Sequence, residues 1–269
     1  MDFKKDNKIL KSSISSDGVL FLTLNNPHNH NALSEEMMFN VQSALDESIN
    51  NKQIRVIVIS ANGPTFSAGH DLKELTRARK NPDKGREYFQ EVMGKCSKLM
   101  QTIVNCPKPV IAEVTGVATA AGCQLVASCD LAYASKTATF VTPGVNIGLF
   151  CSTPMVAVSR NISNKHSMEM LLTGDSISAD KAERIGLINR AVDTNLLKKQ
   201  TLEVAQKISK KSALTLKIGK KAFYKQIDMT LSEAYDFASN VMVENMLRLD
   251  AEEGIGAFIE KRKPNWQDK

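Results

Sequence analysis

Apolar residues in the first two thirds of the chain follow two spacings, one typical of strands and one of helices. Residues 18–24, 54–60 and 109–114 are short apolar runs bounded by Asn, Gly or Pro, and they predict strands. Apolar residues recur at three- and four-residue steps over 89–103, which predicts a helix. Ser34 precedes two glutamates and is predicted to cap another helix. This alternation predicts an α/β core.

The pattern of apolar residues changes at about residue 193. Short runs at 130–135 and 139–141 still predict strands, but after about residue 193 only helical spacing remains. The predicted helices are 196–208, 213–226, 231–249 and 251–262. Because no Pro, Gly or Ser-rich linker intervenes, we expect a core of residues 1–195 and a helical region of residues 196–269 that packs on another surface.

The composition is that of an ordinary globular chain. Of 269 residues, 42% are hydrophobic and 24% are charged, which excludes collagen, a disordered tail and a disulfide-stapled miniprotein. Lys and Arg number 35 and Asp and Glu 29, so the net charge is +6. This charge favours an anionic ligand or solubility. A nucleic-acid partner is not expected, because the basic residues are dispersed and no aromatic stacking pattern accompanies them.

Cysteine spacing and apolar runs give no sign of export or of a membrane span. The five cysteines are Cys96, Cys106, Cys123, Cys129 and Cys151. Their odd number and the lack of CxxC spacing predict reduced, buried thiols.

The four histidines are scattered along the sequence, so no metal site is expected. Residues 1–6 lack the apolar core of a signal peptide, and the uncharged run 137–159 contains Pro and Gly. We therefore expect a cytoplasmic protein without a membrane partner.

Two segments rich in small residues carry the candidate chemistry. Residues 64–75 and 114–125 each place small side chains between a strand and a helix. At such turns a backbone N–H can point at a ligand, and the first amides of a helix have no partner within it. Two N–H groups aimed at one carbonyl oxygen form an oxyanion hole. The alternative reading is that small residues allow the strand and the helix to pack closely.

The same segments carry a family resemblance. Residues 66–73, 116–130 and 142–148 resemble three signatures of the crotonase (enoyl-CoA hydratase/isomerase) superfamily. Residues 171–192 and 253–264 are similar to the segments that follow, so the resemblance runs in order from about residue 15 to 266. Residues 67–75 and 148–154 look most like the enoyl-CoA hydratase domain-containing protein 3 subgroup.

The resemblance implies both a fold and a ligand. The fold is a crotonase-like spiral of ββα units, in the α/β class, with a C-terminal helical trimerisation region. The protein would form a homotrimer or a dimer of trimers, and the apolar stripes of its C-terminal helices exceed what one core needs. The ligand is an acyl-CoA thioester, with coenzyme A as part of the substrate and no separate cofactor.

The resemblance also implies which residues form the site. It puts the oxyanion-hole amides at Ala68 and Ala121. The family usually has Gly at the second position, so Ala fits there only if the backbone needs no positive φ. Residues 30–33 would follow the nucleotide, and Phe258 and Lys261 would reach the CoA of a neighbouring subunit. The implied substrate and CoA contacts are His30, Ala32, Ala68, Gly69, His70, Asp71, Ala121, Phe258 and Lys261.

Two departures from the family pattern limit the expected activity. Hydratases of the family carry two glutamates that handle the water and the α-proton, and here their positions hold Gln124 and Gly144. An amide takes no proton near neutral pH, and glycine has no side chain. Each positioned acid or base contributes about 100- to 10,000-fold to a rate. We therefore expect little ordinary hydration.

Other side chains are candidates for the missing chemistry, each with a plainer reading. His70 could titrate near neutral pH, or it could point outward or be hydrogen-bonded. Cys151 is a nucleophile or, as we favour, a buried thiol. Glu113 is an in-site base or part of a subunit-interface salt bridge. Asp71 is expected to cap a helix and Asp130 to be structural.

Two functions therefore remain open from the sequence. One is an enzyme that stabilises the enolate of an acyl-CoA thioester with a replaced or absent glutamate pair. The other is a non-catalytic acyl-CoA-binding protein. Both predict CoA binding.

Overall fold

Two sheets built by a repeated strand–strand–helix unit form the body of the protein. The computed structural model describes residues 8–269, so the prediction for residues 1–6 lies outside the described residues. The larger sheet has the order β1-β2-β3-β5-β7-β10, in which β1 is antiparallel to β2 and the other pairs are parallel. Its strands are β1 Leu10–Ile14, β2 Val19–Leu24, β3 Val56–Ala61, β5 Val110–Val114, β7 Leu131–Ser135 and β10 Arg190–Val192.

The smaller sheet has the order β4-β6-β8-β9, with β9 antiparallel to β8. Its strands are β4 Thr65–Ser67, β6 Val117–Thr119, β8 Thr139–Val141 and β9 Ile177–Ser178. Each of β3, β5 and β7 in the larger sheet is followed by a strand of the smaller one and then by a helical segment. This is the expected ββα unit. Because the unit repeats, the turns that follow the strands of successive units lie beside one another.

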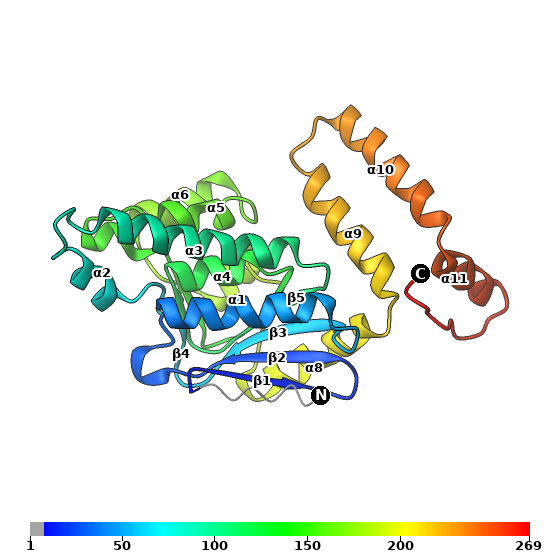
Figure 1. Cartoon of the computed structure of the whole chain (residues 1–269), viewed down its shortest axis with the longest axis horizontal. Coiled ribbons are helices and arrows are strands. Elements are labelled where there is room, and N and C mark those ends of the chain that lie inside the picture. The colour runs from blue at the N-terminus through cyan, green and yellow to red at the C-terminus, as the bar shows by residue number, and fades with distance from the viewer. Residues whose placement is uncertain (1–7) are drawn as a thin grey trace.

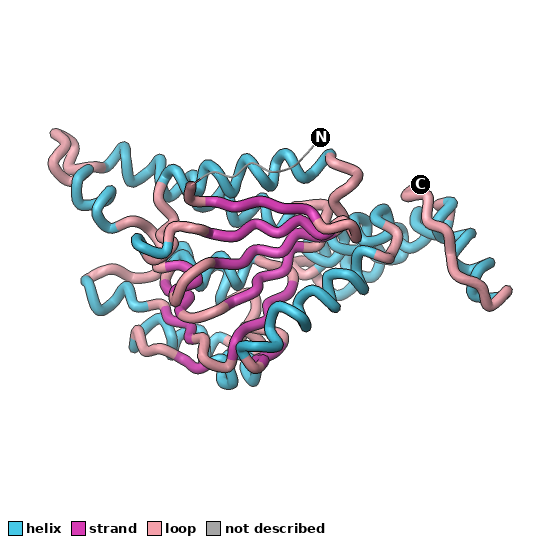
Figure 2. The backbone as a smooth tube through the Cα atoms, turned by 90° about the horizontal axis from the view of Figure 1, so that it is seen from below, coloured by secondary structure: helices cyan, strands magenta, loops and turns pink. Residues whose placement is uncertain are grey.

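Helices cover both faces of the larger sheet, as Figure 2 shows. The main core joins one face to α1 Glu35–Asn50, α3 Arg86–Asn105 and α4 Ala121–Ser128. A smaller core joins the opposite face to α8 Thr194–Ser209. The strands of this sheet are buried on both sides, which explains their continuous apolar runs. Ser34 accepts a hydrogen bond from the Met37 amide at 3.2 Å, so the predicted cap of α1 is confirmed.

Shorter helices complete the body. They are η1 Pro27–Asn29, α2 Leu72–Ala78, η2 Pro143–Ile147, α5 Ser152–Val158, α6 Asn164–Thr173 and α7 Ala179–Ile185. All five cysteines are buried and unpaired, as expected. None of the helices between residues 8 and 269 combines the length and the apolar character that a membrane span requires.

The last three helices form an arm that projects from the body (Figure 1). They are α9 Ala213–Gln226, α10 Leu231–Met246 and α11 Leu249–Ile259. The prediction of one helix over 231–249 is wrong at its end, because Arg248 leaves the helical conformation and caps α11. The predicted boundary at residues 195 and 196 falls in the first turn of α8, which packs on the sheet, so the projecting part begins with α9.

A buried polar contact anchors the arm to the body. Lys220 of α9 places Nζ 2.6 Å from Asp130 Oδ2, and it donates to the carbonyls of Ile103 and Lys108 at 3.0 and 3.1 Å. Tyr224, one turn further on, donates to Asp130 Oδ1 at 3.0 Å. Asp130 also accepts the Val110 amide, so the structural role expected for it is confirmed.

The segment after α11 forms a second anchor. The Trp266 ring packs on Gly254 of α11, and its Nε1 donates to the Lys210 carbonyl at 2.9 Å. Asp268 forms an ion pair with Arg55 at the start of β3 and accepts the Ala213 amide at 2.7 Å. The last residues thus tie α11 to the base of the arm.

Candidate functional site

The two segments of small residues lie against each other. β4 pairs in parallel with β6, which aligns the chain after Ser67 with the chain after Ala118. A Cβ built on Gly69 would lie 3.0 Å from the Ala121 nitrogen. A Cβ on Gly122 would lie 2.3 Å from the Ser67 carbonyl oxygen. Close packing therefore explains both glycines, and it also brings the amides of two loops to one place.

The first turn of α4 presents unpaired amides at this place. The first amide bonded within the helix is that of Gln124, which donates to Ala120 O at 3.0 Å. The amide of Ala121, at the first position of the helix, is therefore without an intrahelical acceptor, and the helix dipole adds positive potential there. Ala121 itself has no positive φ. The strained position is Ala120, with φ 50° and ψ −119°.

The structure corrects the amide expected from the other loop. The Ala68 amide donates to the His30 carbonyl at 3.0 Å, so it is not free to bind a ligand. The Gly69 amide points to Ser67 Oγ at 3.3 Å. The next amide, that of His70, has no acceptor within residues 8–269. The prediction of Ala68 as donor is wrong by two residues, and His70 carries the available N–H.

The two positions at which the resemblance implies glutamates, 124 and 144, lie in the interior. Gln124 is 4% exposed on α4, with its Oε1 3.9 Å from Cys96 Sγ. Gly144 is buried in η2, and its amide donates to Cys151 Sγ at 3.3 Å. A Cβ on Gly144 would lie 2.8 Å from the Leu149 carbonyl oxygen. A side chain at position 144 therefore has no room without a backbone shift.

The imidazole of His70 is largely enclosed. Both ring nitrogens are buried, and neither has a hydrogen-bond partner in the described part of the chain. Burial lowers the pKa of His70, and the nearby Leu33 carbonyl opposes this effect without reversing it. The ring is therefore not outward-pointing and favours its neutral form.

Residues 30–33, which the resemblance places along the nucleotide, run alongside the His70 loop. The Leu33 amide donates to Gly69 O at 2.7 Å. Asn31, which the sequence reasoning overlooked, is fully buried, accepts the Asn26 amide and donates to the carbonyls of Asn62 and Thr65. Its φ of 50° is left-handed, a conformation that Asn tolerates better than most residues, so the residue type was the one signal in the sequence.

Asp71 is a helix cap rather than a reacting group, as expected. It accepts the Lys73 amide at 2.8 Å and the Asn29 side-chain amide at 2.7 Å. Burial raises the pKa of Asp71, but the hydrogen bonds from Asn29, Lys73 and Glu74 outweigh it and the net pKa is lowered. The carboxylate therefore stays ionised at neutral pH.

The remaining candidates lie elsewhere or are inert. Cys151 is buried, and burial raises the pKa of its thiol. Glu113 lies on the sheet face that α8 covers, near Thr201 and Lys198, and not beside the His70 loop. Phe258 and Lys261 lie on and just after α11, at the opposite end of the molecule from α2 (Figure 1). One chain therefore does not bring them to the site.

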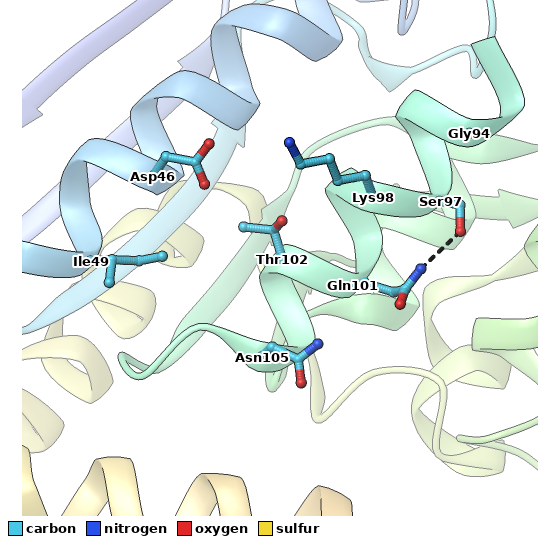
Figure 3. A pocket seen from close by; sticks show the side chains of 8 residues that line it. All are labelled: Asp46, Ile49, Gly94, Ser97, Lys98, Gln101, Thr102 and Asn105. Carbon is cyan, nitrogen blue, oxygen red and sulfur yellow. Dashed lines mark hydrogen bonds between the residues drawn. The ribbon is translucent and has the colours of Figure 1, made fainter. Parts of the chain in front are cut away.

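A separate open groove of about 380 Å³ lies between α1 and α3. Figure 3 shows Asp46 of α1 facing Lys98 of α3 across it, with Ser97 and Gln101 joined by a hydrogen bond. None of the predicted site residues lines this groove. Within residues 8–269, no three His, Cys, Asp or Glu side chains are grouped to hold a metal ion.

Comparisons with known proteins identify relatives of the whole chain. The family model described as enoyl-CoA hydratase/isomerase matches residues 15–269. The chain is 49% identical over 257 residues to "Enoyl-CoA hydratase domain-containing protein 3, mitochondrial" of Mus musculus, covering 96% of this chain and 84% of that protein. The protein of the same name from Homo sapiens is 48% identical over 250 residues, covering 93% and 81%.

Solved structures agree with the sequence relatives. The crystal structure of human enoyl-CoA hydratase domain-containing protein 3 has a TM-score of 0.91 and 46% identity, covering 96% of this chain and all of that one. An enoyl-CoA hydratase of Mycobacterium smegmatis has a TM-score of 0.92 and 44% identity, covering 97% and 99%. The predicted fold class and the resemblance to this subgroup are confirmed.

The expected cytoplasmic location is contradicted, because the curated relatives at 43–49% identity are named as mitochondrial.

Proposed function

The chain belongs to the enoyl-CoA hydratase/isomerase family, and on that premise we propose that it binds an acyl-CoA thioester between residues 66–71 and the start of α4. One observation carries the proposal. The packing of Gly69 against the Ala121 nitrogen brings two amide-bearing turns to one place, and the amides of His70 and Ala121 have no acceptor among residues 8–269. A single carbonyl oxygen can then accept both.

This pair of amides favours a thioester enolate over the neutral thioester. Removing a proton from the carbon next to the carbonyl concentrates negative charge on the oxygen. Fixed N–H dipoles stabilise that charge without reorganisation, and the helix dipole of α4 adds to them. Loss of one such donor typically costs about 100- to 1,000-fold in rate. The proposed reaction class is therefore enolate chemistry on an acyl-CoA.

Ordinary hydration of an enoyl-CoA does not fit these residues. Gln124 holds no transferable proton, and the space at Gly144 is already filled by Leu149 and Cys151. We expect turnover of crotonyl-CoA far below that of a hydratase with both glutamates. A non-catalytic acyl-CoA-binding protein is the second candidate, and the same two positions favour it.

Binding is tested with a pair of ligands that differ at the carbonyl. Calorimetry compares acetyl-CoA with S-ethyl-CoA, a thioether that lacks the oxygen. The thioester is expected to bind more tightly, because only it reaches the amides of His70 and Ala121. No binding of acetyl-CoA at millimolar concentration would refute the proposal, and equal affinities would refute the oxyanion hole.

The arm supports a proposed assembly as a homotrimer or a dimer of trimers. Its helices expose large apolar side chains, among them Leu231, Leu247 and Phe258, and α9 and α10 bury none of their residues. Such a face is expected to be covered by another copy, which would bring Phe258 and Lys261 near a neighbour's CoA. Light scattering that gave a monomer at micromolar concentration would contradict this.

The names of the relatives also support a mitochondrial location for this chain. Fractionation of cells of its source would test the location directly. Recovery in the cytosolic fraction alone would refute it.

A further inference from the structure

We propose that the imidazole of His70 is the base that takes the proton from the carbon next to the thioester carbonyl. It would replace the acid–base chemistry that Gln124 and Gly144 do not supply. This inference rests on the proposed function, because it needs an acyl-CoA seated on the amides of His70 and Ala121.

His70 is the only group of the site with a suitable proton affinity. The segments 66–71, 120–124 and 143–151 contain four titratable side chains, those of His70, Asp71, Cys123 and Cys151. Asp71 is engaged as the cap of α2. Burial raises the pKa of Cys123 to about 12 and also raises that of Cys151. Near neutral pH only the imidazole is uncharged with a free lone pair.

No hydrogen bond of ordinary geometry holds the ring in the described part of the chain, although the Leu33 carbonyl lies close to it. Both nitrogens are buried and unpaired among the residues that the structure describes. Buried polar atoms in native proteins are nearly always hydrogen-bonded, so an unpaired buried group calls for an explanation, of which a catalytic role is one. Cap residues such as Asp71 and organising residues such as Asn31 have every expected contact, so His70 differs from its neighbours.

Backbone pairing sets the side on which the ring lies. Leu33 and His70 form an isolated parallel bridge, which directs their side chains to the same side of the two segments. Leu33 is 1% exposed and belongs to the main core, so this is the interior side. The His70 ring, acting as the base, is therefore shielded from bulk water. The backbone N–H of the same residue would donate to the thioester carbonyl oxygen.

The charged groups near the His70 loop are engaged with other partners. The titratable groups on the surrounding elements are Glu35 of α1, Glu74 of α2 and Tyr88 of α3, besides Asp71. Glu35 pairs with Lys95 at 2.6 Å, and Glu74 accepts the Glu35 amide at 3.2 Å. Burial lowers the pKa of His70 and the Leu33 carbonyl opposes this, and no charged side chain is among the causes of the shift.

The proton transfer balances within the complex. A ring nitrogen lone pair takes the α-proton, the C–H electron pair forms the new C=C bond, and the carbonyl π pair becomes the enolate lone pair. The product is an enolate held by two amides beside an imidazolium. Return of the proton, or of a deuteron from exchanged solvent, restores both partners, so no further reactant is needed.

Deuterium exchange tests the inference without knowledge of the natural reaction. The full-length protein is incubated with acetyl-CoA in D₂O, and mass spectrometry follows deuterium entry into the acetyl group. His70→Gln and His70→Ala keep the backbone amide and are expected to retain acetyl-CoA affinity, measured by calorimetry. Their exchange rate is expected to fall about 100- to 10,000-fold. His166→Gln, in the first turn of α6 and outside the proposed site, is the matched control and should exchange at the rate of the unchanged protein.

Two further readouts separate catalysis from structure. The exchange rate of the unchanged protein should rise with pH through an ionisation below 6.5 and then level off, whereas the variants should lack this step. Added imidazole should partly restore exchange in His70→Ala. Exchange that persists in His70→Gln, or acetyl-CoA that binds without any exchange, would overturn the inference but not the binding site. Failure of acetyl-CoA to bind at all would overturn the proposed function and the inference with it.

Discussion

Replacing Ala120 by glycine should stabilise the protein, although Ala→Gly substitutions usually destabilise. Ala120 caps α4 with φ 50° and ψ −119°, a conformation that glycine adopts freely and an L side chain does not. Backbone strain of this kind costs about 1–3 kcal/mol. The greater freedom of glycine in the unfolded chain offsets about 0.4–1 kcal/mol. Ala120 is only partly buried, so its methyl contributes little packing. The net gain expected is about 0.5–2 kcal/mol.

Ala44→Gly is the matched control. Ala44 lies in the middle of α1 and is buried, so the same chemical change should cost about 1–2 kcal/mol through helix propensity and lost packing. Thermal unfolding at one fixed protein concentration measures both variants, because assembly would make the midpoint concentration-dependent. A change of 1 kcal/mol corresponds to about 2–4 °C in a chain of this size. A midpoint for Ala120→Gly as low as that of Ala44→Gly would show that the turn is not strained.

Three further substitutions test the contacts described above. Lys220→Met should lower the free energy of unfolding by about 3–5 kcal/mol, because it leaves Asp130 buried beside Tyr224 without its cation. Its control, Lys221→Met on the exposed side of α9, should change that free energy by less than about 0.5 kcal/mol. Equal free energies for the two variants in urea unfolding would contradict the anchor. Gly144→Ala should destabilise the protein by about 1–3 kcal/mol, because the new Cβ meets the Leu149 carbonyl oxygen. Its control, Gly219→Ala, faces open space on α9 and should stabilise the protein by up to about 1 kcal/mol. Similar midpoints of thermal unfolding for both variants would refute the close packing in η2. Hydrogen bonds from Arg262 and the Asn265 amide lower the pKa of Glu253 to about 2 from an ordinary 4.5, so this contact stabilises the segment after α11 above pH 4.5 and is lost as the pH falls towards 2. Fluorescence of Trp266, the only tryptophan, should report that release, and Glu253→Gln should show the released signal already at neutral pH.

The longer elements could be predicted from the sequence because their apolar patterns are local. Residues 18–24, 54–60 and 109–114 became β2, β3 and β5, and the helix expected over 213–226 became α9 with the same bounds. In the smaller sheet the run 139–141 predicted β8 with its observed bounds, but β4 and β6, of three residues each, and β9, of two, are too short to show periodicity. Their existence depends on pairing with one another, which no single segment encodes.

The site could be predicted to the level of its segments but not of its atoms. The turns around Gly69 and Gly122 were visible as small residues between a strand and a helix. Which amide remains free was not visible, because the Ala68 amide is taken by the carbonyl of His30, a residue 38 positions earlier in the chain. The space at Gly144 likewise depends on how the chain returns at Leu149.

The ion pair between Arg55 and Asp268 has a consequence for the order of folding during synthesis. The two residues are 213 positions apart, and at about 5–20 residues per second roughly 10–40 s separate their addition to the chain. The sheets and α1 to α8 can form in that interval, since none of their strands pairs with the arm. The apolar faces of α9 to α11 are made after these elements, when a folded body already exists to receive them. During synthesis, these apolar side chains therefore become available only after the surface that α9 packs against has been made.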